Sequence, residues 1–132
     1  MDYRIWRSSR SRFGSEQLPG GEHDETLTAL SAYTDDELKK IADAGFNAIW
    51  LHGVLHHLVQ VAPFMELGTD SAKHITAMQT LIDRAAKYGI KVFLYMQPPR
   101  ALDDRDDFWE KHPDCRGEAL EFPNITLRCM CT

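Results

Sequence analysis

The sequence has few cysteines and no long apolar run, and each shortage excludes a class of protein. Its 132 residues include three cysteines, an odd number, which fits reduced thiols better than a disulfide framework. No apolar stretch approaches the roughly 20 residues needed to cross a bilayer. Charged Asp2 and Arg4 stand where a signal peptide would have its apolar core. We therefore expect a cytoplasmic protein with no membrane partner.

Positive charge is also in short supply. The net charge of -5 argues against a nucleic-acid partner. The apolar fraction of 43% and the charged fraction of 27% are those of a globular protein, and the length suffices for one domain. One local exception is the segment Tyr3–Gly14, where four arginines alternate with aromatic and polar residues. Its pattern predicts an edge-like strand followed by a turn.

Catalytic and metal-binding signatures are scarce as well. The sequence has no Gly-rich phosphate loop, no G-x-S-x-G and no recognisable Ser-His-Asp set. His52, His56 and His57 lie close together, but we place His52 at a strand end and His56 in a loop, so the helical spacing of zinc-binding histidines does not apply. We expect neither a metal nor a cofactor. The acidic run Asp103–Asp107 is interpreted as helix caps and a solvated face, because adjacent carboxylates point apart.

A helix followed by a glycine and a buried strand is the clearest pattern. Thr34 is a natural N-cap, and Glu37 three residues later completes a capping box. Gly45 supplies the C-terminal cap. The segment Phe46–Leu51 then predicts a strand that is covered on both faces, as in parallel sheets.

The same pattern recurs further along the chain. A second helix begins at an Asp70 or Ser71 cap and ends at Gly89, and Ile90–Met96 follows as a second buried strand. The buried stripe predicted for this helix is Ile75, Met78, Leu81, Ile82 and Ala85.

The C-terminal third is predicted to continue this series. A short helix capped by Asp103 or Asp104 runs through Lys111, and the segment Cys115–Asn124 is predicted to be a loop. Ile125–Thr132 is predicted to be a third strand of the series. Phe108 and Trp109 are candidates for an exposed aromatic surface that could stack on a sugar ring, but packing under the loop is the interpretation we favour.

The fold class predicted from these units is α/β, as about the first half of a (β/α)8 TIM barrel. We expect three to four parallel strands with crossover helices, because a complete barrel needs about 250 residues. Residues 1–132 would form one incomplete barrel domain, with the first strand and a connecting segment in 1–32 and the repeated units in 33–132. The open edge of such a sheet favours self-association.

Polar residues at the predicted strand ends are the candidate binding residues. Ligands of parallel β/α folds bind outside the carboxyl ends of the strands. His52, Gln97 and Arg100 occupy those ends, and they suit a polyhydroxylated or anionic ligand. Alternatively, His52 simply caps its strand through backbone hydrogen bonds, and the sequence leaves both readings open.

Several segments together resemble a known family. "YTDDELKKIADAGFNAIWLHGVL", "RAAKYGIKVFLYMQPPRAL", "FWEKHPDCRGEAL" and "CMCT" are similar to the N-terminal half of a barrel group, the glycoside-hydrolase-like proteins related to family 20 β-N-acetylhexosaminidases. The resemblance covers about Arg4 to Thr132 and consists of structural motifs. It implies a carbohydrate ligand for the full-length parent.

The resemblance also implies roles for individual residues. The sugar-binding arginine of the first strand corresponds to Arg7 or Arg10, and His52 becomes a sugar-hydroxyl contact. Relatives carry Asn-Glu-Pro-Arg where this chain has Gln97 and Pro98, so an acidic role is lost there, whereas Arg100 is retained.

No catalytic residue is expected within the chain. The family hydrolyses glycosidic bonds by substrate assistance with an Asp-Glu pair, which would lie beyond Thr132. The chain alone is therefore expected to be inactive. Two alternatives stay open, a self-contained α/β module that binds a ligand or a protein without catalysis, and a barrel of unrelated chemistry.

Overall fold

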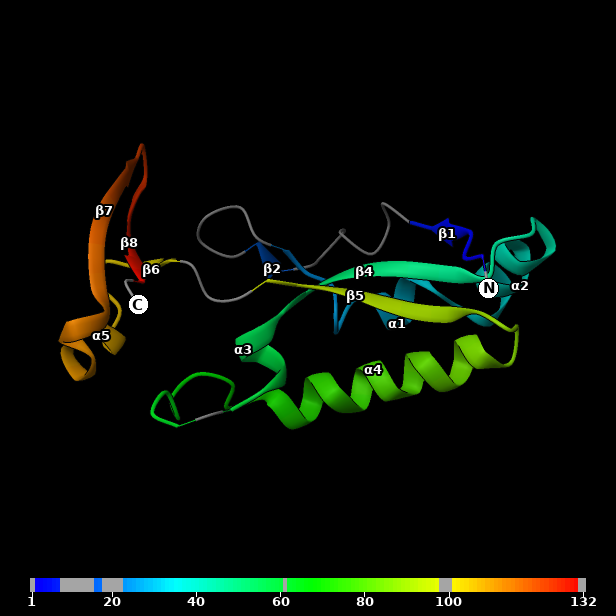
Figure 1. The fold of residues 1–132 in the computed structure, drawn as a ribbon, viewed down its shortest axis with the longest axis horizontal. Coiled ribbons are helices and arrows are strands. Elements are labelled where there is room, and N and C mark those ends of the chain that lie inside the picture. The colour runs from blue at the N-terminus through cyan, green and yellow to red at the C-terminus, as the bar shows by residue number, and fades with distance from the viewer. Residues whose placement is uncertain (1, 8–15, 18–22, 61, 98–100, 131–132) are drawn as a thin grey trace.

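The protein is a mixed α/β chain with a parallel sheet at its centre. The computed structural model describes residues 2–7, 16–17, 23–60, 62–97 and 101–130 (Figure 1). Three parallel strands form the central sheet in the order β1 (Ile5–Trp6), β4 (Ala48–Val54) and β5 (Lys91–Gln97). The strand predicted in the arginine-rich N-terminal segment is confirmed as β1 at an edge of this sheet. The turn predicted after it lies outside the described residues.

Both predicted helix-glycine-strand units are present. Helix α2 (Asp35–Asp43) begins after Thr34, whose hydroxyl oxygen accepts from the Glu37 backbone N–H at 3.3 Å. Gly45 and Gly89 adopt φ of +85° and +70°, the left-handed conformation that ends a helix. Strand β4 is longer than predicted and reaches Val54, because backbone pairing with β5 continues to that residue.

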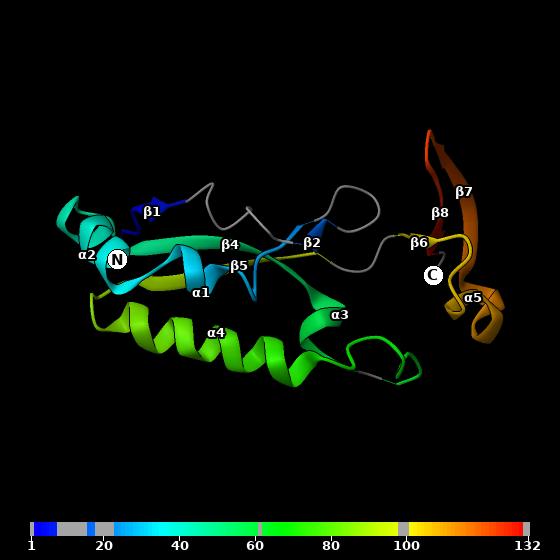
Figure 2. The ribbon, with the colours of Figure 1, turned by 180° about the vertical axis from the view of Figure 1, so that it is seen from behind.

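One face of the parallel sheet carries the hydrophobic core. Helix α4 (Ser71–Ala86) runs along β4 and β5 on one side of the sheet (Figures 1 and 2). Side chains of α2, α4 and the short α1 (Ala29–Ala32) pack against Ile49 and Leu51 of β4. Of the predicted α4 stripe, Met78, Leu81 and Ala85 are confirmed as buried, whereas Ile75 and Ile82 are exposed. The helix buries His74 as well, which was not predicted.

The C-terminal third departs from the prediction. Strands β6 (Ala101–Asp103), β7 (Arg116–Phe122) and β8 (Ile125–Met130) form an antiparallel sheet in the order β6-β8-β7. A strand begins at Ile125 as predicted, but it is antiparallel, so its predicted place in the parallel series is wrong. The loop predicted before it is also wrong, because most of that segment forms β7. Phe122 pairs with Ile125, so Pro123-Asn124 forms a two-residue hairpin turn. Because of this turn, β8 pairs with β7 rather than with a strand of the parallel sheet.

Helix α5 (Phe108–Lys111) and a 3-10 turn (Pro113–Cys115) connect β6 to β7. Phe108 and Trp109 are 2% and 3% exposed, so the favoured interpretation, packing under the loop, is confirmed, and the alternative of an exposed aromatic surface is wrong. The Trp109 indole N–H donates to the Asp103 carbonyl at 2.8 Å, and the Phe108 ring lies 5.6 Å from that of Phe64. These contacts bury both rings beneath the segment that connects β6 to β7.

Three short elements lie around the carboxyl end of β4. Strands β2 (Glu16–Gln17) and β3 (His23–Asp24) form an antiparallel pair, and helix α3 (Leu55–Leu58) follows β4 directly. His56 therefore lies in a helix, where a loop was predicted. Within the described part of the chain, every helix is too short or too polar to cross a bilayer.

Candidate functional site

The face of the parallel sheet opposite the helices is rich in aromatic rings. Successive side chains of a strand point to opposite faces, and the pairing places Trp50 beside Phe93 and His52 beside Tyr95. Ring centroids of Trp50 and Tyr95 are 5.7 Å apart, and those of Tyr3 and Phe93 are 5.0 Å apart. Phe93 and Tyr95 are 36% and 43% exposed. This face can accept a ligand or a further layer of structure.

Arg7 brings a cation to this face, beside the ring of Trp50. Its Cζ lies 4.1 Å from the Trp50 ring centroid, a cation-π contact. Its Nη2 lies 3.6 Å from Oε2 of Glu25, a fully buried carboxylate. Nη1 of Arg7 is buried and has no hydrogen-bond partner among the described residues. A guanidinium held in this way can donate to an oxygen of a ligand.

His52 lies on the same face and is tied to the segment after β3. Its backbone N–H donates to the Glu25 carboxylate at 2.7 Å, and its carbonyl accepts from the Glu25 N–H at 3.0 Å. Its ring packs 4.9 Å from Trp50 and 5.3 Å from Tyr95. These backbone hydrogen bonds lie within β4, two residues before its last residue, Val54, so they do not cap the strand end. A binding role for the half-buried ring stays a prediction.

The other predicted binding residues cannot be placed at this site. Gln97 ends β5, where it pairs with Val54, but its side chain lies outside the described part of the structure. Arg10 and Arg100 also fall outside the described residues. Of the two arginines that the resemblance offered for the first strand, Arg7 is the described one.

A second polar cluster lies at the end of β4, built around the buried carboxylate of Asp24. Oδ1 accepts from the Thr26 backbone N–H at 2.8 Å and from the Thr26 hydroxyl. Oδ2 accepts from the Val54 N–H at 3.1 Å and pairs with Nδ1 of His57 at 2.9 Å. Nδ1 of His74 lies 2.6 Å from the Thr26 hydroxyl oxygen and 3.9 Å from Oδ1 of Asp24.

Burial and hydrogen bonding set the charges of this cluster. Burial opposes ionisation of Asp24, but the hydrogen bonds from His57, Thr26 and Val54 outweigh it and lower its pKa to about 2. Burial lowers the pKa of His56 to about 4, with a further contribution from neighbouring His57. Burial also lowers the pKa of His74, against the attraction of Asp24. At neutral pH the cluster thus holds the carboxylate of Asp24, and burial favours the neutral forms of His56 and His74.

A cavity of about 350 Å³ opens beside this cluster. Its lining includes His56, His57 and His74 from the cluster side and Leu102 and Asp106 from the C-terminal third. Nδ1 of His56 is buried and has no hydrogen-bond partner among the described residues. The cluster is therefore reachable by water or a small solute.

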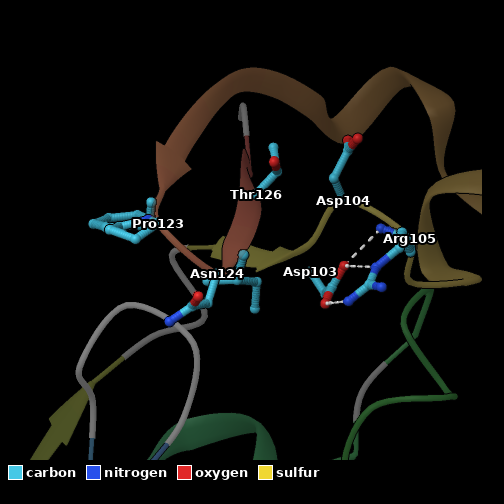
Figure 3. Close-up of a pocket in the computed structure, with 8 residues that line it drawn as sticks. Asp103, Asp104, Arg105, Pro123, Asn124 and Thr126 are labelled. Atoms are coloured by element: carbon cyan, nitrogen blue, oxygen red, sulfur yellow. Dashed lines mark hydrogen bonds and ion pairs between the residues drawn. The ribbon is translucent and has the colours of Figure 1, made fainter.

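A second cavity, of about 370 Å³, lies at the β7–β8 turn (Figure 3). Its charged groups are already paired. Arg105 donates to both carboxylate oxygens of Asp103, at 3.1 and 2.9 Å. Asp104 accepts from Arg116 at 2.7 Å and from Arg128 at 2.8 Å. These ion pairs hold the sheet together, so this cavity is a weaker candidate for a site.

Sequence reasoning missed most of the cluster at Asp24. Asp24 and Glu25 lie in a short charged segment that carries no motif, and His74 was not singled out. A signal for His74 did exist, because it falls one turn before Met78 on the apolar stripe of α4, where a polar residue is unusual. The partners of that residue, 50 and 17 positions away, are not visible in the sequence.

Comparison of the chain with protein-family models, with curated proteins and with solved structures finds no match.

Proposed function

We propose that this chain forms the carbohydrate-binding first half of a (β/α)8 barrel in a glycoside-hydrolase-like protein. In this proposal the open face of the parallel sheet is the barrel interior, and its carboxyl end is the mouth of a sugar site. The observation that carries the proposal is Arg7, stacked on Trp50 and paired with buried Glu25, beside His52.

The arrangement of the parallel sheet supports a barrel over a doubly wound fold. Strand order β1-β4-β5 follows the chain without reversal, and all described pairs in this sheet are parallel. Helices α1, α2 and α4 all pack on one face, whereas doubly wound sheets carry helices on both. If further strands were added in the same order and direction, with their helices on the same face, the sheet would close into a barrel.

The chemistry of the open face supports a sugar as the ligand. Aromatic rings such as Trp50 and Tyr95 offer flat apolar surfaces for a sugar ring, and Arg7 and His52 offer hydrogen-bonding groups for its hydroxyls. The function proposed for this chain is binding, because the groups on this face suit recognition of a sugar.

The proposal is tested by sugar binding to the full chain. We expect N-acetylglucosamine oligosaccharides to quench tryptophan fluorescence and to give saturable binding in calorimetry. The substitutions Arg7→Ala and His52→Ala should each weaken that binding at least tenfold. Arg105→Ala, which removes an exposed arginine far from this face, is the matched control. If no oligosaccharide binds, or if Arg7→Ala binds as tightly as the parent, the proposal is wrong.

The outer edge of β5 is part of the same proposal. Within the described sheet β5 pairs only with β4, and in a barrel the next parallel strand would cover its other edge. Without such a strand we expect the chain to self-associate in sedimentation experiments, and Leu94→Lys on β5 should reduce this association.

A second candidate function is a self-contained binding module without catalysis. It is favoured by the antiparallel sheet β6-β8-β7, which stands where a further β/α unit was predicted. A monodisperse, cooperatively folding monomer that binds no sugar would support this alternative.

A further inference from the structure

We propose that Asp24, His57 and His74 bind one divalent transition-metal ion of the Zn²⁺ type. Each residue offers one ligand atom, and the three atoms lie within 4.8 Å of one another. Ligands of one tetrahedral ion bound at about 2.0–2.2 Å lie roughly 3–4 Å apart, so small side-chain shifts bring the three groups onto an ion.

The donor set itself favours this class of cation. Two imidazole nitrogens and one carboxylate oxygen form a set found in zinc and related sites, whereas Ca²⁺ and Mg²⁺ prefer sets made of oxygen alone. The residues come from three separate elements, β3, α3 and α4. An ion at this point would tie β3 and α3 to the first turns of α4.

Asp24 is held in place for such a role. One oxygen accepts the Thr26 backbone N–H and the other accepts the Val54 backbone N–H, so the carboxylate cannot rotate freely. Oδ2 also pairs with Nδ1 of His57, so the lone pair that this hydrogen bond occupies faces that histidine and becomes available to an ion when the bond is exchanged. When the ion binds His57 through Nδ1, the proton between Nδ1 and Asp24 leaves that atom and the ring takes up a proton at Nε2, so His57 binds as a neutral imidazole with no net change in protons.

The neighbouring cavity completes the site. His57 and His74 line a space of about 350 Å³, which leaves room for a water as a further ligand and gives the ion a path of entry. The buried Nδ1 of His56, which has no hydrogen-bond partner among the described residues, borders the same space. The cluster thus combines a rigid carboxylate, two imidazoles and access, which a purely structural hydrogen-bond network does not require.

The first test is the binding of ZnCl₂ to the full, tag-free chain after chelator treatment. We expect calorimetry to give one ion per chain with a Kd below about 1 μM, and Co²⁺ in its place to give the visible absorption of a tetrahedral site. His57→Asn and His74→Asn should each weaken binding at least a hundredfold.

His112→Asn is the matched control, because His112 is also half-buried and bonded to a carboxylate, that of Glu66. It should retain the parent affinity within about threefold. The proposal is overturned if the parent chain shows no saturable binding, or if His57→Asn and His74→Asn bind Zn²⁺ as the parent does. Because the parent chain alone can refute it, the test holds even if a variant fails to fold.

Discussion

Replacing Asp24 by Asn should destabilise the fold by about 2–4 kcal/mol. The change keeps size and shape but puts an N–H₂ group where one carboxylate oxygen was. In the structure each oxygen accepts two hydrogen bonds, one of them from a backbone N–H. The amide nitrogen must therefore face two donors, and whichever way the side chain turns, one buried backbone N–H of Thr26 or Val54 loses its acceptor.

The magnitude follows from these lost partners. An unsatisfied buried donor costs about 1–3 kcal/mol, and the hydrogen bond with His57 loses its charge assistance. The His57 ring can offset part of this cost by changing its tautomer, so we expect the free energy of unfolding to fall by about 2–4 kcal/mol. Against a stability of roughly 5–15 kcal/mol for an ordinary domain, the loss is large.

Urea unfolding in the presence of a chelator is the assay, since bound metal would otherwise add to the stability of the parent. The midpoint should fall with an unchanged slope. The matched control is Asp83→Asn, because Asp83 is exposed and accepts from the Gln79 amide at 2.9 Å, so the stability lost should stay within about 0.5 kcal/mol. A loss for Asp24→Asn as small as that of the control would refute the hydrogen-bond accounting.

Three further predictions concern other parts of the fold. Gly68→Ala should cost about 1–3 kcal/mol more than Gly89→Ala in urea unfolding. Both glycines have positive φ, but a Cβ at Gly68 would lie 2.5 Å from the His56 carbonyl oxygen, whereas one at Gly89 meets nothing within 4 Å. Equal losses of stability would contradict this. Phe108→Ala should cost about 3–5 kcal/mol by the same assay, as expected for a buried ring, and a neutral effect would mean that the ring is exposed. Hydrogen bonds from Arg128 and Arg116 lower the pKa of Asp104 from 3.8 to about 2. The contribution of the Asp104 carboxylate to stability is therefore complete above pH 3.8 and is lost as the pH falls toward 2. Asp104→Asn should flatten the dependence of the free energy of unfolding on pH in that window, and an unchanged dependence would reject the role given to Asp104.

The local signals in the sequence predicted the elements around the core well. Thr34 as an N-cap and Gly45 and Gly89 as helix ends are set by backbone chemistry within a few residues, and the structure confirms all three. The two strands after these glycines were also identified, although β4 extends three residues further than predicted. That extension depends on pairing with β5, which no local pattern reveals.

The candidate sites were less accessible to prediction. His52 was identified because a polar residue followed an apolar run, and it lies within β4, two residues before the strand ends at Val54. Glu25 and Asp24 were missed, because their importance comes from contacts with residues 27 to 33 positions away. The hairpin at Pro123-Asn124 was missed for a different reason, since its turn signal was read as the end of a loop.

By itself, the sequence determined the helix-glycine-strand units and the absence of a long apolar segment, because capping and periodicity act over one or two helical turns. Only the tertiary structure decided the direction of β8, the burial of Phe108 and the meeting of Asp24, His57 and His74. Strand pairing and burial depend on contacts between distant segments, and the free energy of those contacts is fixed only when the chain has folded. For this protein, the residues with the richest chemistry are those that folding brings together.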